Sequence, residues 1–141
     1  MVHSFDGFNH LIRLDKGESV VGSLQKFIAE VKCEGAWLAG IGGVQAATLG
    51  FYNLETKEYK WQDFKGLYEL TSLNGTIALN EQDEPVLHLH GTLSDGNYQT
   101  IGGHIKDLIA AGTIEIFVHR AYKPIHRKTD QSTGLKILDL P

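Results

Sequence analysis

The chain has 141 residues, of which 42% are hydrophobic and 21% are charged, and it carries a formal net charge of -4. This length suits one domain over residues 1–141 with a core of its own, and the composition excludes a disordered chain. The excess of acidic over basic residues argues against a broad nucleic-acid-binding surface, which normally carries a stripe of Lys and Arg.

The N-terminal region predicts one strand and one helix. Alternating side chains between Phe8 and Leu14 indicate a strand. Gly17-Glu18-Ser19 is expected to open a helix, because the apolar residues that follow recur at the spacing of one helical face, at Val20, Val21, Leu24, Phe27, Ile28 and Val31. Gly35 is the expected end of this helix, since glycine is common at that position. This is the main amphipathic helix of the sequence.

Beyond this helix the sequence predicts strands joined by turns. Gly40-Ile41-Gly42-Gly43 lacks the third glycine of a dinucleotide-binding loop and favours a bulge between strands. Asn74-Gly75 is a strong signal for a tight hairpin turn, and Asp107 to Ala111 is expected to form a short helical turn that Gly112 ends. The remaining runs with strand character are Trp37–Ile41, Ala46–Tyr52, Tyr59–Trp61, Leu67–Leu73, Thr76–Leu79 and Thr113–Tyr122.

Three of the seven histidines lie in one short segment, PVLHLHGTLSDGNYQTIGGH at residues 85–104. His88 and His90 are two residues apart, so on a strand both side chains leave the same face. His104 follows a turn-like stretch at Asp95-Gly96-Asn97, and a returning strand would place its imidazole beside the other two. Three neutral imidazoles with an open fourth position are a common zinc arrangement. The segment therefore predicts a divalent metal site, with zinc as the expected ion.

Two glutamates lie within alternating strand patterns and are candidates for a catalytic role. Glu69 or Glu115 could act as a general base for a metal-bound water, whose pKa zinc lowers to about 7. Either could equally face water or pair with Arg120 or Arg127, which belong to a short basic stretch expected to form a solvated loop or a subunit contact. Catalytic and non-catalytic roles of these glutamates therefore both stay open.

The order of the predicted elements indicates the fold class. Many short strands joined by tight turns, together with one clear helix, indicate an α+β fold around a largely antiparallel sheet. A parallel doubly wound sheet would need repeated alternation of strands and helices, which the sequence lacks. The chain also shows no internal repeat and no linker, so a single domain is expected.

With these residues in view, the chain resembles the PPC (plant and prokaryote conserved) domain family over nearly its whole length. The resemblance implies a PPC-like fold with a strongly bent antiparallel sheet, and it implies a homotrimer. It further implies that His88, His90 and His104 are the ligands of a divalent ion, as in prokaryotic single-domain members. The motifs that carry the resemblance are GIGGVQAATLGFYN at 40–53, GLYELTSLNGTIAL at 66–79, the His-x-His strand with Leu93-Ser94-Asp95, Gly102-Gly103-His104, and DQSTGLKIL at 130–138.

The DNA-binding role of this family does not transfer with its residues. Plant members carry AT-hook segments centred on Arg-Gly-Arg, and this chain has no such tripeptide. Only the resemblance to the family therefore favours binding to nucleic acid, and the acidic net charge of the chain argues against it. In plant members the domain resembles an oligomerisation and partner-binding module, which makes the segment Gly66 to Leu70 a candidate site for a protein partner.

Cysteine use and hydropathy favour a cytoplasmic protein. Cys33 is the only cysteine, so no disulfide framework is expected. No apolar run approaches the roughly 20 residues that span a bilayer, and the N-terminus lacks the layout of a secretory signal. A membrane protein is therefore not expected.

Three hypotheses about function follow. A metal-dependent enzyme would use the open coordination position of the metal on a small substrate. A regulatory module would bind a protein partner through the trimer without catalysis. A DNA-associated protein would use the surface of the trimer.

Overall fold

A computed structural model describes residues 1–140 of the chain. All pairings between its strands are antiparallel, apart from one isolated bridge between Leu79 and His126. The elements in chain order are β1 (Val2–Phe5), β2 (Asn9–Leu14), α1 (Val20–Val31), β3 (Ala36–Asn53), β4 (Glu58–Leu79), β5 (Pro85–Ser94), β6 (Thr100–Arg120), β7 (Arg127–Thr129) and β8 (Lys136–Leu138).

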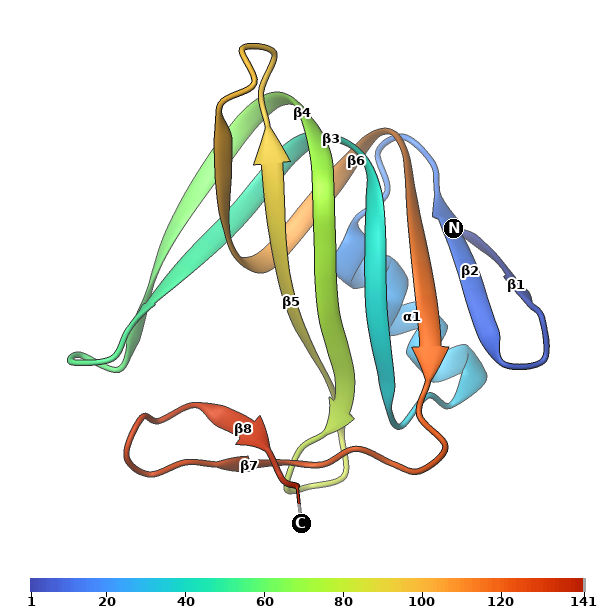
Figure 1. Ribbon diagram of the computed structural model, residues 1–141, viewed down its shortest axis with the longest axis vertical. Helices are drawn as coiled ribbons and strands as arrows, with labels where there is room; N and C mark the ends of the chain where they lie inside the picture. The colour runs from blue at the N-terminus through green and yellow to red at the C-terminus, as the bar shows by residue number, and fades with distance from the viewer. Residues whose placement is uncertain (141) are drawn as a thin grey trace.

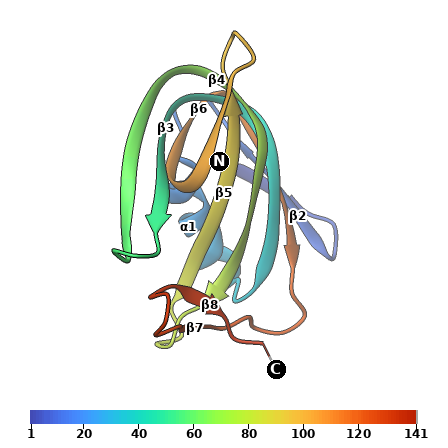
Figure 2. The same cartoon turned by 60° about the vertical axis from the view of Figure 1, so that its left-hand side comes forward.

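The main sheet has six strands in the order β1-β2-β6-β3-β4-β5, and β6 also pairs with β5. The pairings of β3, β4, β5 and β6 therefore form a closed circuit, which requires these long strands to bend (Figures 1 and 2). Helix α1 packs most closely against β6, and its buried face contributes to the core. The predicted α+β fold with a bent, largely antiparallel sheet and one main helix is confirmed.

Helix α1 begins as its sequence predicts but ends earlier. The hydroxyl of Ser19 accepts a hydrogen bond of 2.9 Å from the amide N–H of Gly22, which caps the first turn. The predicted end at Gly35 is wrong, because Lys32 already adopts the left-handed conformation that ends the helix, with φ of 50°. No helix among the described residues has the length and apolar character needed to cross a membrane.

The predicted hairpin turn at Asn74-Gly75 is wrong, because both residues lie inside β4. Gly75 pairs with Leu89 of β5, and a Cβ atom at this position would lie 2.3 Å from the backbone oxygen of His88. The glycine is therefore needed for the close approach of two strands and not for a turn. The two short strands predicted on either side of it belong to one long strand.

The predicted helical turn at Asp107 to Ala111 is also wrong, because this segment is part of β6. The carboxylate of Asp107 accepts hydrogen bonds of 3.0 Å from the hydroxyl of Ser19 and from the amide N–H of Val21. This aspartate therefore binds the start of α1 to the sheet instead of starting a helix of its own.

The bulge predicted at the glycine-rich run is confirmed, since the register of β3 and β4 shifts between Gly40 and Gly42.

The C-terminal segment forms a hairpin that the sequence does not predict. Strands β7 and β8 pair with each other and lie across the end of β4 and β5 (Figure 1). The amide N–H of Leu79 donates a 2.7 Å hydrogen bond to the carbonyl of Ile125, which joins this segment to the end of β4. Arg127 of β7 is buried, with 8% of its surface exposed. The prediction that this basic stretch forms a solvated loop is therefore wrong at Arg127.

Candidate metal centre

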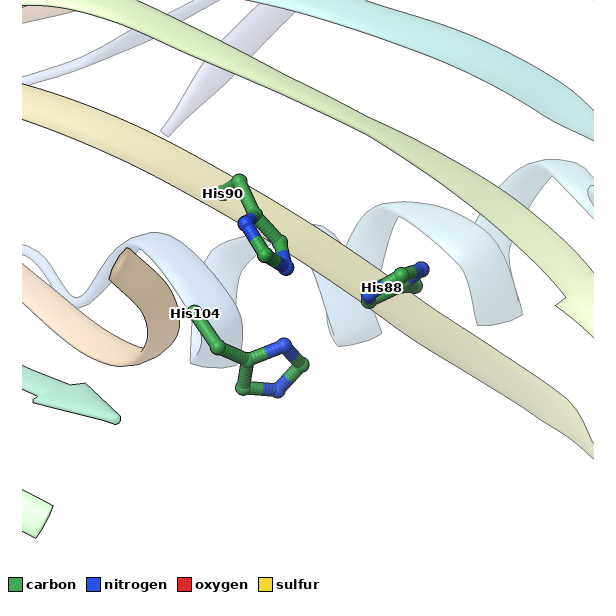
Figure 3. Close-up of side chains that lie close together, drawn as sticks. All are labelled: His88, His90 and His104. Atoms are coloured by element: carbon green, nitrogen blue, oxygen red, sulfur yellow. The ribbon is translucent and has the colours of Figure 1, made fainter. Parts of the chain in front are cut away.

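Three histidines converge where β5 meets β6 (Figure 3). His88 and His90 belong to β5, and His104 of β6 lies directly opposite His90 in the strand register. One ring nitrogen of each histidine lies within 4.8 Å of a ring nitrogen of the other two. The ring centroids are separated by 5.1 to 5.3 Å. The structure thus brings together all three residues that the sequence predicts as metal ligands.

The turn between β5 and β6 sets this register. The carboxylate of Asp95 accepts hydrogen bonds from the amide N–H groups of Asn97 and Gln99, at 2.8 and 2.9 Å. Leu89 lies between the two histidines of β5 and is buried in the core. Because side chains alternate along a strand, a slip of one residue would bury the histidines and expose this leucine. The burial of Leu89 therefore holds both imidazoles on the opposite face.

His104 is held against aromatic rings. Its ring centroid lies 4.9 Å from that of Tyr59 and 6.0 Å from that of Trp61, and the two aromatic rings stack on each other. Its Nδ1 atom is buried and has no hydrogen-bond partner among residues 1–140. Figure 3 shows the ring nitrogen nearest the backbone turned towards the other two imidazoles. A metal ion between the three rings would provide the partner that this nitrogen lacks.

His88 has a charged neighbour that the sequence analysis missed. The Nη2 atom of Arg127 lies 3.1 Å from Nδ1 of His88, and the guanidinium also donates to the hydroxyl of Thr76 and to the carbonyl of Lys136. With Nδ1 facing a cation, Nε2 is the nitrogen of His88 that is available to a metal. Arg127 is 39 positions from His88 in the chain, so no local spacing pattern connects the two.

Burial is the largest cause of the lowered pKa values at this site. It lowers the pKa of His88 to about 4, with further contributions from the charge of Arg127 and from the other two histidines. Burial, followed by His90, also lowers the pKa of His104. Both rings are therefore neutral at pH 7, and a neutral imidazole has the free lone pair that a metal requires. This donor set, with its unpartnered nitrogen, fits a divalent ion such as zinc.

The metal-free protein is expected to lose stability as the pH falls from about 6.5 towards about 4. The folded-state pKa values of His88 and His104 lie below the ordinary value of 6.5, so below that pH protons bind preferentially to the unfolded chain. The stabilisation is complete above pH 6.5 and declines towards pH 4. Urea unfolding of chelator-treated protein measures it, and a free energy of unfolding that is constant over this interval would contradict the burial of neutral rings.

The histidines line an open cavity of about 1120 Å³. One wall of this cavity is the C-terminal hairpin, which contributes Leu135 and Leu138, and another wall is aromatic, with Phe51 and Tyr52. The lining residues that carry a full charge are Arg127 and Lys136. No carboxylate lies among the lining residues that the structure describes. The site is therefore a largely apolar cavity with three imidazoles and two cations.

The two candidate glutamates lie elsewhere. Glu69 is exposed on β4, where it pairs with Gly43 of β3 and Ser94 of β5. Glu115 is exposed on β6 and borders a smaller hollow near Phe117. Neither lines the cavity that contains the histidines. The structure does not bring either of these carboxylates to the predicted metal ligands.

Comparisons with known proteins agree with this fold. The sequence profile of the Plants and Prokaryotes Conserved (PCC) domain matches residues 3–121. A metal-containing protein from Archaeoglobus fulgidus is 30% identical, with a TM-score of 0.85 and an alignment covering 99% of this chain and 99% of that chain. A plant- and prokaryote-conserved (PPC) protein from Pyrococcus horikoshii is also 30% identical, with a TM-score of 0.86 and coverage of 99% and 96%.

A further solved structure is similar over the same length. A candidate DNA-binding protein from Bacteroides thetaiotaomicron is 28% identical, with a TM-score of 0.93 and an alignment covering 98% of this chain and 96% of that chain. A comparison with curated proteins finds no match to the sequence. The similarity to solved structures therefore extends over nearly the whole chain, including the C-terminal hairpin.

Proposed function

The chain belongs to the Plants and Prokaryotes Conserved (PCC) domain family, and on this premise we propose that it binds one divalent metal ion, zinc, in each subunit of a homotrimer. The ligands are His88, His90 and His104. The observation that carries the proposal is the convergence of three imidazoles with ring nitrogens within 4.8 Å of one another. The similar protein from Archaeoglobus fulgidus is metal-containing, which supports metal binding by this chain.

The number of ligands favours a site that binds a further molecule. Zinc held by three protein ligands keeps a fourth position for water or another ligand and makes that water more acidic, whereas structural zinc has four protein ligands. No other His, Cys, Asp or Glu joins the three histidines among residues 1–140. The cavity beside the histidines is large enough for a small molecule. Metal binding is thus proposed to serve the recognition of a small ligand.

The homotrimer is supported by apolar side chains on the outer face of the sheet. Leu11 of β2 and Phe117 of β6 are directly opposite each other in the register and are 54% and 44% exposed. Ile41 of β3 is exposed on the same sheet. Contact with other subunits would cover such side chains. We place the trimer in the cytoplasm, in keeping with its single, unpaired cysteine.

Elemental analysis of untagged protein, together with light scattering, tests this proposal. We expect close to one zinc ion per chain and a particle mass of three chains, and we expect a chelator to remove the ion. The protein must be prepared without a histidine tag, because such a tag binds metal itself. A protein that stays metal-free after incubation with zinc or manganese would contradict the proposal for the histidine site.

DNA association is a second candidate, because a similar structure from Bacteroides thetaiotaomicron is a candidate DNA-binding protein. The net charge of -4 and the absence of Arg-Gly-Arg count against it. Retention on immobilised DNA that weakens steeply with salt would support this function. No retention at low salt would exclude it.

A protein partner is proposed to bind at the segment Gly66 to Leu70. The stretch of β4 before Glu69 pairs with β3 on one side only, so it forms an edge of the sheet. Leu67 is 76% exposed at this edge. An extended peptide can add to such an edge. Capture of a partner that is lost in Leu67→Asp, with metal content unchanged, would support this role, and capture unaffected by the substitution would count against it.

A further inference from the structure

Arg127 is a buried cation without a counterion. Its guanidinium donates to three neutral groups, which are the carbonyl of Lys136, the hydroxyl of Thr76 and Nδ1 of His88. Its Nε atom is buried and has no partner, and no carboxylate of residues 1–140 forms an ion pair with it. Burying a charge without an opposite charge is costly. Such a cation at the wall of an open cavity is suited to binding an anion from outside the chain.

The contact between Arg127 and His88 conflicts with metal binding. A guanidinium can only donate hydrogen bonds, so Nδ1 of His88 must accept, and the single proton of the neutral ring is then on Nε2. A metal on Nε2 takes the place of that proton, and the ring stays neutral only if Nδ1 is protonated. Two N–H groups would then face each other. Metal binding therefore removes the acceptor that Nη2 of Arg127 has at His88.

The rest of the cavity indicates what Arg127 would bind instead. Lys136 is a second cation at the wall, and no carboxylate lies among the described lining residues. The remaining walls are mainly apolar, and they exclude water from a bound ligand better than a polar surface would. A planar carboxylate matches the fork of a guanidinium and forms short charge-assisted hydrogen bonds with it. The main apolar lining residues are Trp37, Phe51, Val86, Leu87, Leu135 and Leu138.

We propose that Arg127 binds the carboxylate of a small organic acid whose apolar part occupies this cavity, and that the bound metal makes Arg127 available by ending its contact with His88. This inference rests on the proposed metal site and names the ligand class of that site. It adds a residue outside 3–121, the range that the family profile matches. Because coupling between two sites is reciprocal, the carboxylate also raises the affinity of the protein for the metal.

Calorimetric titration of zinc-loaded protein with 4-methylpentanoate tests the ligand class. We expect binding at least about tenfold tighter than that of the uncharged 4-methylpentanamide, because hydrogen bonds from a guanidinium to a charged carboxylate are about twice as strong as those to a neutral group. We expect chelator-treated protein to bind the carboxylate more weakly than the zinc-loaded protein. Equal binding of acid and amide would overturn the proposal. Tighter binding of inorganic phosphate than of the carboxylate would overturn the assignment to a carboxylate.

Variants at two neighbouring cations test the role of Arg127. Arg127→Met is expected to weaken 4-methylpentanoate at least about tenfold while zinc content stays near one per chain, and Arg127→Lys is expected to restore part of the affinity. Lys128→Met is the matched control, since Lys128 is exposed and pairs with Asp139. Unchanged carboxylate binding in zinc-loaded Arg127→Met would overturn this inference alone. A wild-type protein without zinc would overturn the proposed metal site.

If Arg127→Met does not fold, Arg127→Lys takes its place, and its affinity for 4-methylpentanoate is expected to fall below that of the wild type while zinc is retained, because lysine lacks the planar fork of the guanidinium. The acid, the amide and phosphate compared on zinc-loaded and on metal-free wild type need no variant at this position. Carboxylate binding that does not depend on zinc would contradict the release of Arg127 from His88.

Discussion

Replacement of His104 by alanine is expected to remove the metal from the protein. The ring nitrogens of His88, His90 and His104 lie within 4.8 Å of one another, and no fourth ligand from residues 1–140 joins them. With only two imidazoles bound, water would occupy the remaining coordination positions of the ion. Since the loss of an outer partner of a metal ligand already costs about 10–100-fold in affinity, the loss of a direct ligand is expected to cost more than about 100-fold. Elemental analysis after dialysis measures the loss.

A histidine elsewhere on the same strand provides the control. His119 lies on β6, is exposed, and its Nδ1 is 2.7 Å from the side-chain oxygen of Asn9. His119→Ala is expected to retain close to one ion per chain, and His88→Ala is expected to behave like His104→Ala. Circular dichroism of each variant shows whether the fold is intact. Full metal content in folded His104→Ala would place the metal somewhere else.

Replacement of Gly75 by alanine is expected to destabilise the protein strongly. A Cβ atom there would lie 2.3 Å from the backbone oxygen of His88, 2.6 Å from the side chain of Leu89 and 3.0 Å from its Cα atom. Because backbone atoms are involved, strands β4 and β5 must move apart. We expect a loss of about 3 kcal/mol in the free energy of unfolding, at the upper end of the usual cost of overpacking. Urea unfolding at neutral pH measures it.

The effect of Gly75→Ala can be separated from the general cost of replacing a glycine. Gly112 of β6 has no atom within 4 Å of the position that a Cβ would take, so Gly112→Ala is expected to change stability by no more than about 0.5 kcal/mol. The shift of β5 in Gly75→Ala is expected to lower zinc affinity as well, because His88 is the residue that moves. A Gly75→Ala protein as stable as Gly112→Ala would contradict the close strand approach.

The C-terminal hairpin adds to the site what the six-stranded sheet lacks. The sheet provides the three imidazoles, whereas Arg127, Lys136 and part of the apolar wall come from the hairpin. The hairpin is joined to the sheet by the hydrogen bond between Leu79 and Ile125 and by the contact of Arg127 with Thr76. We therefore expect that ligand selectivity depends on this hairpin, while metal binding depends on β5 and β6.

The features that the sequence determines by itself are those with a local physical cause. Side chains alternate along a strand, so the two-residue spacing of His88 and His90 places both on one face whatever the rest of the fold. The turn at Asp95 is stabilised by its own carboxylate, and it brings His104 back within reach. The spacing of apolar residues over 20–31 likewise determines the buried face of α1.

Only the tertiary structure decides the features that depend on a distant partner. Asn74-Gly75 has the composition of a turn, but the approach of β5 makes the glycine part of a long strand. Asp107 is a residue type common at the start of a helix, but it lies in a strand. Its carboxylate accepts a hydrogen bond from the first turn of α1, 86 residues earlier in the chain. Arg127 is placed beside His88 by the hairpin and not by any spacing in the sequence. The preference of a residue type for turn, helix or strand is weak compared with packing between strands. The pairings of β3, β4, β5 and β6 therefore determine the conformation at these positions.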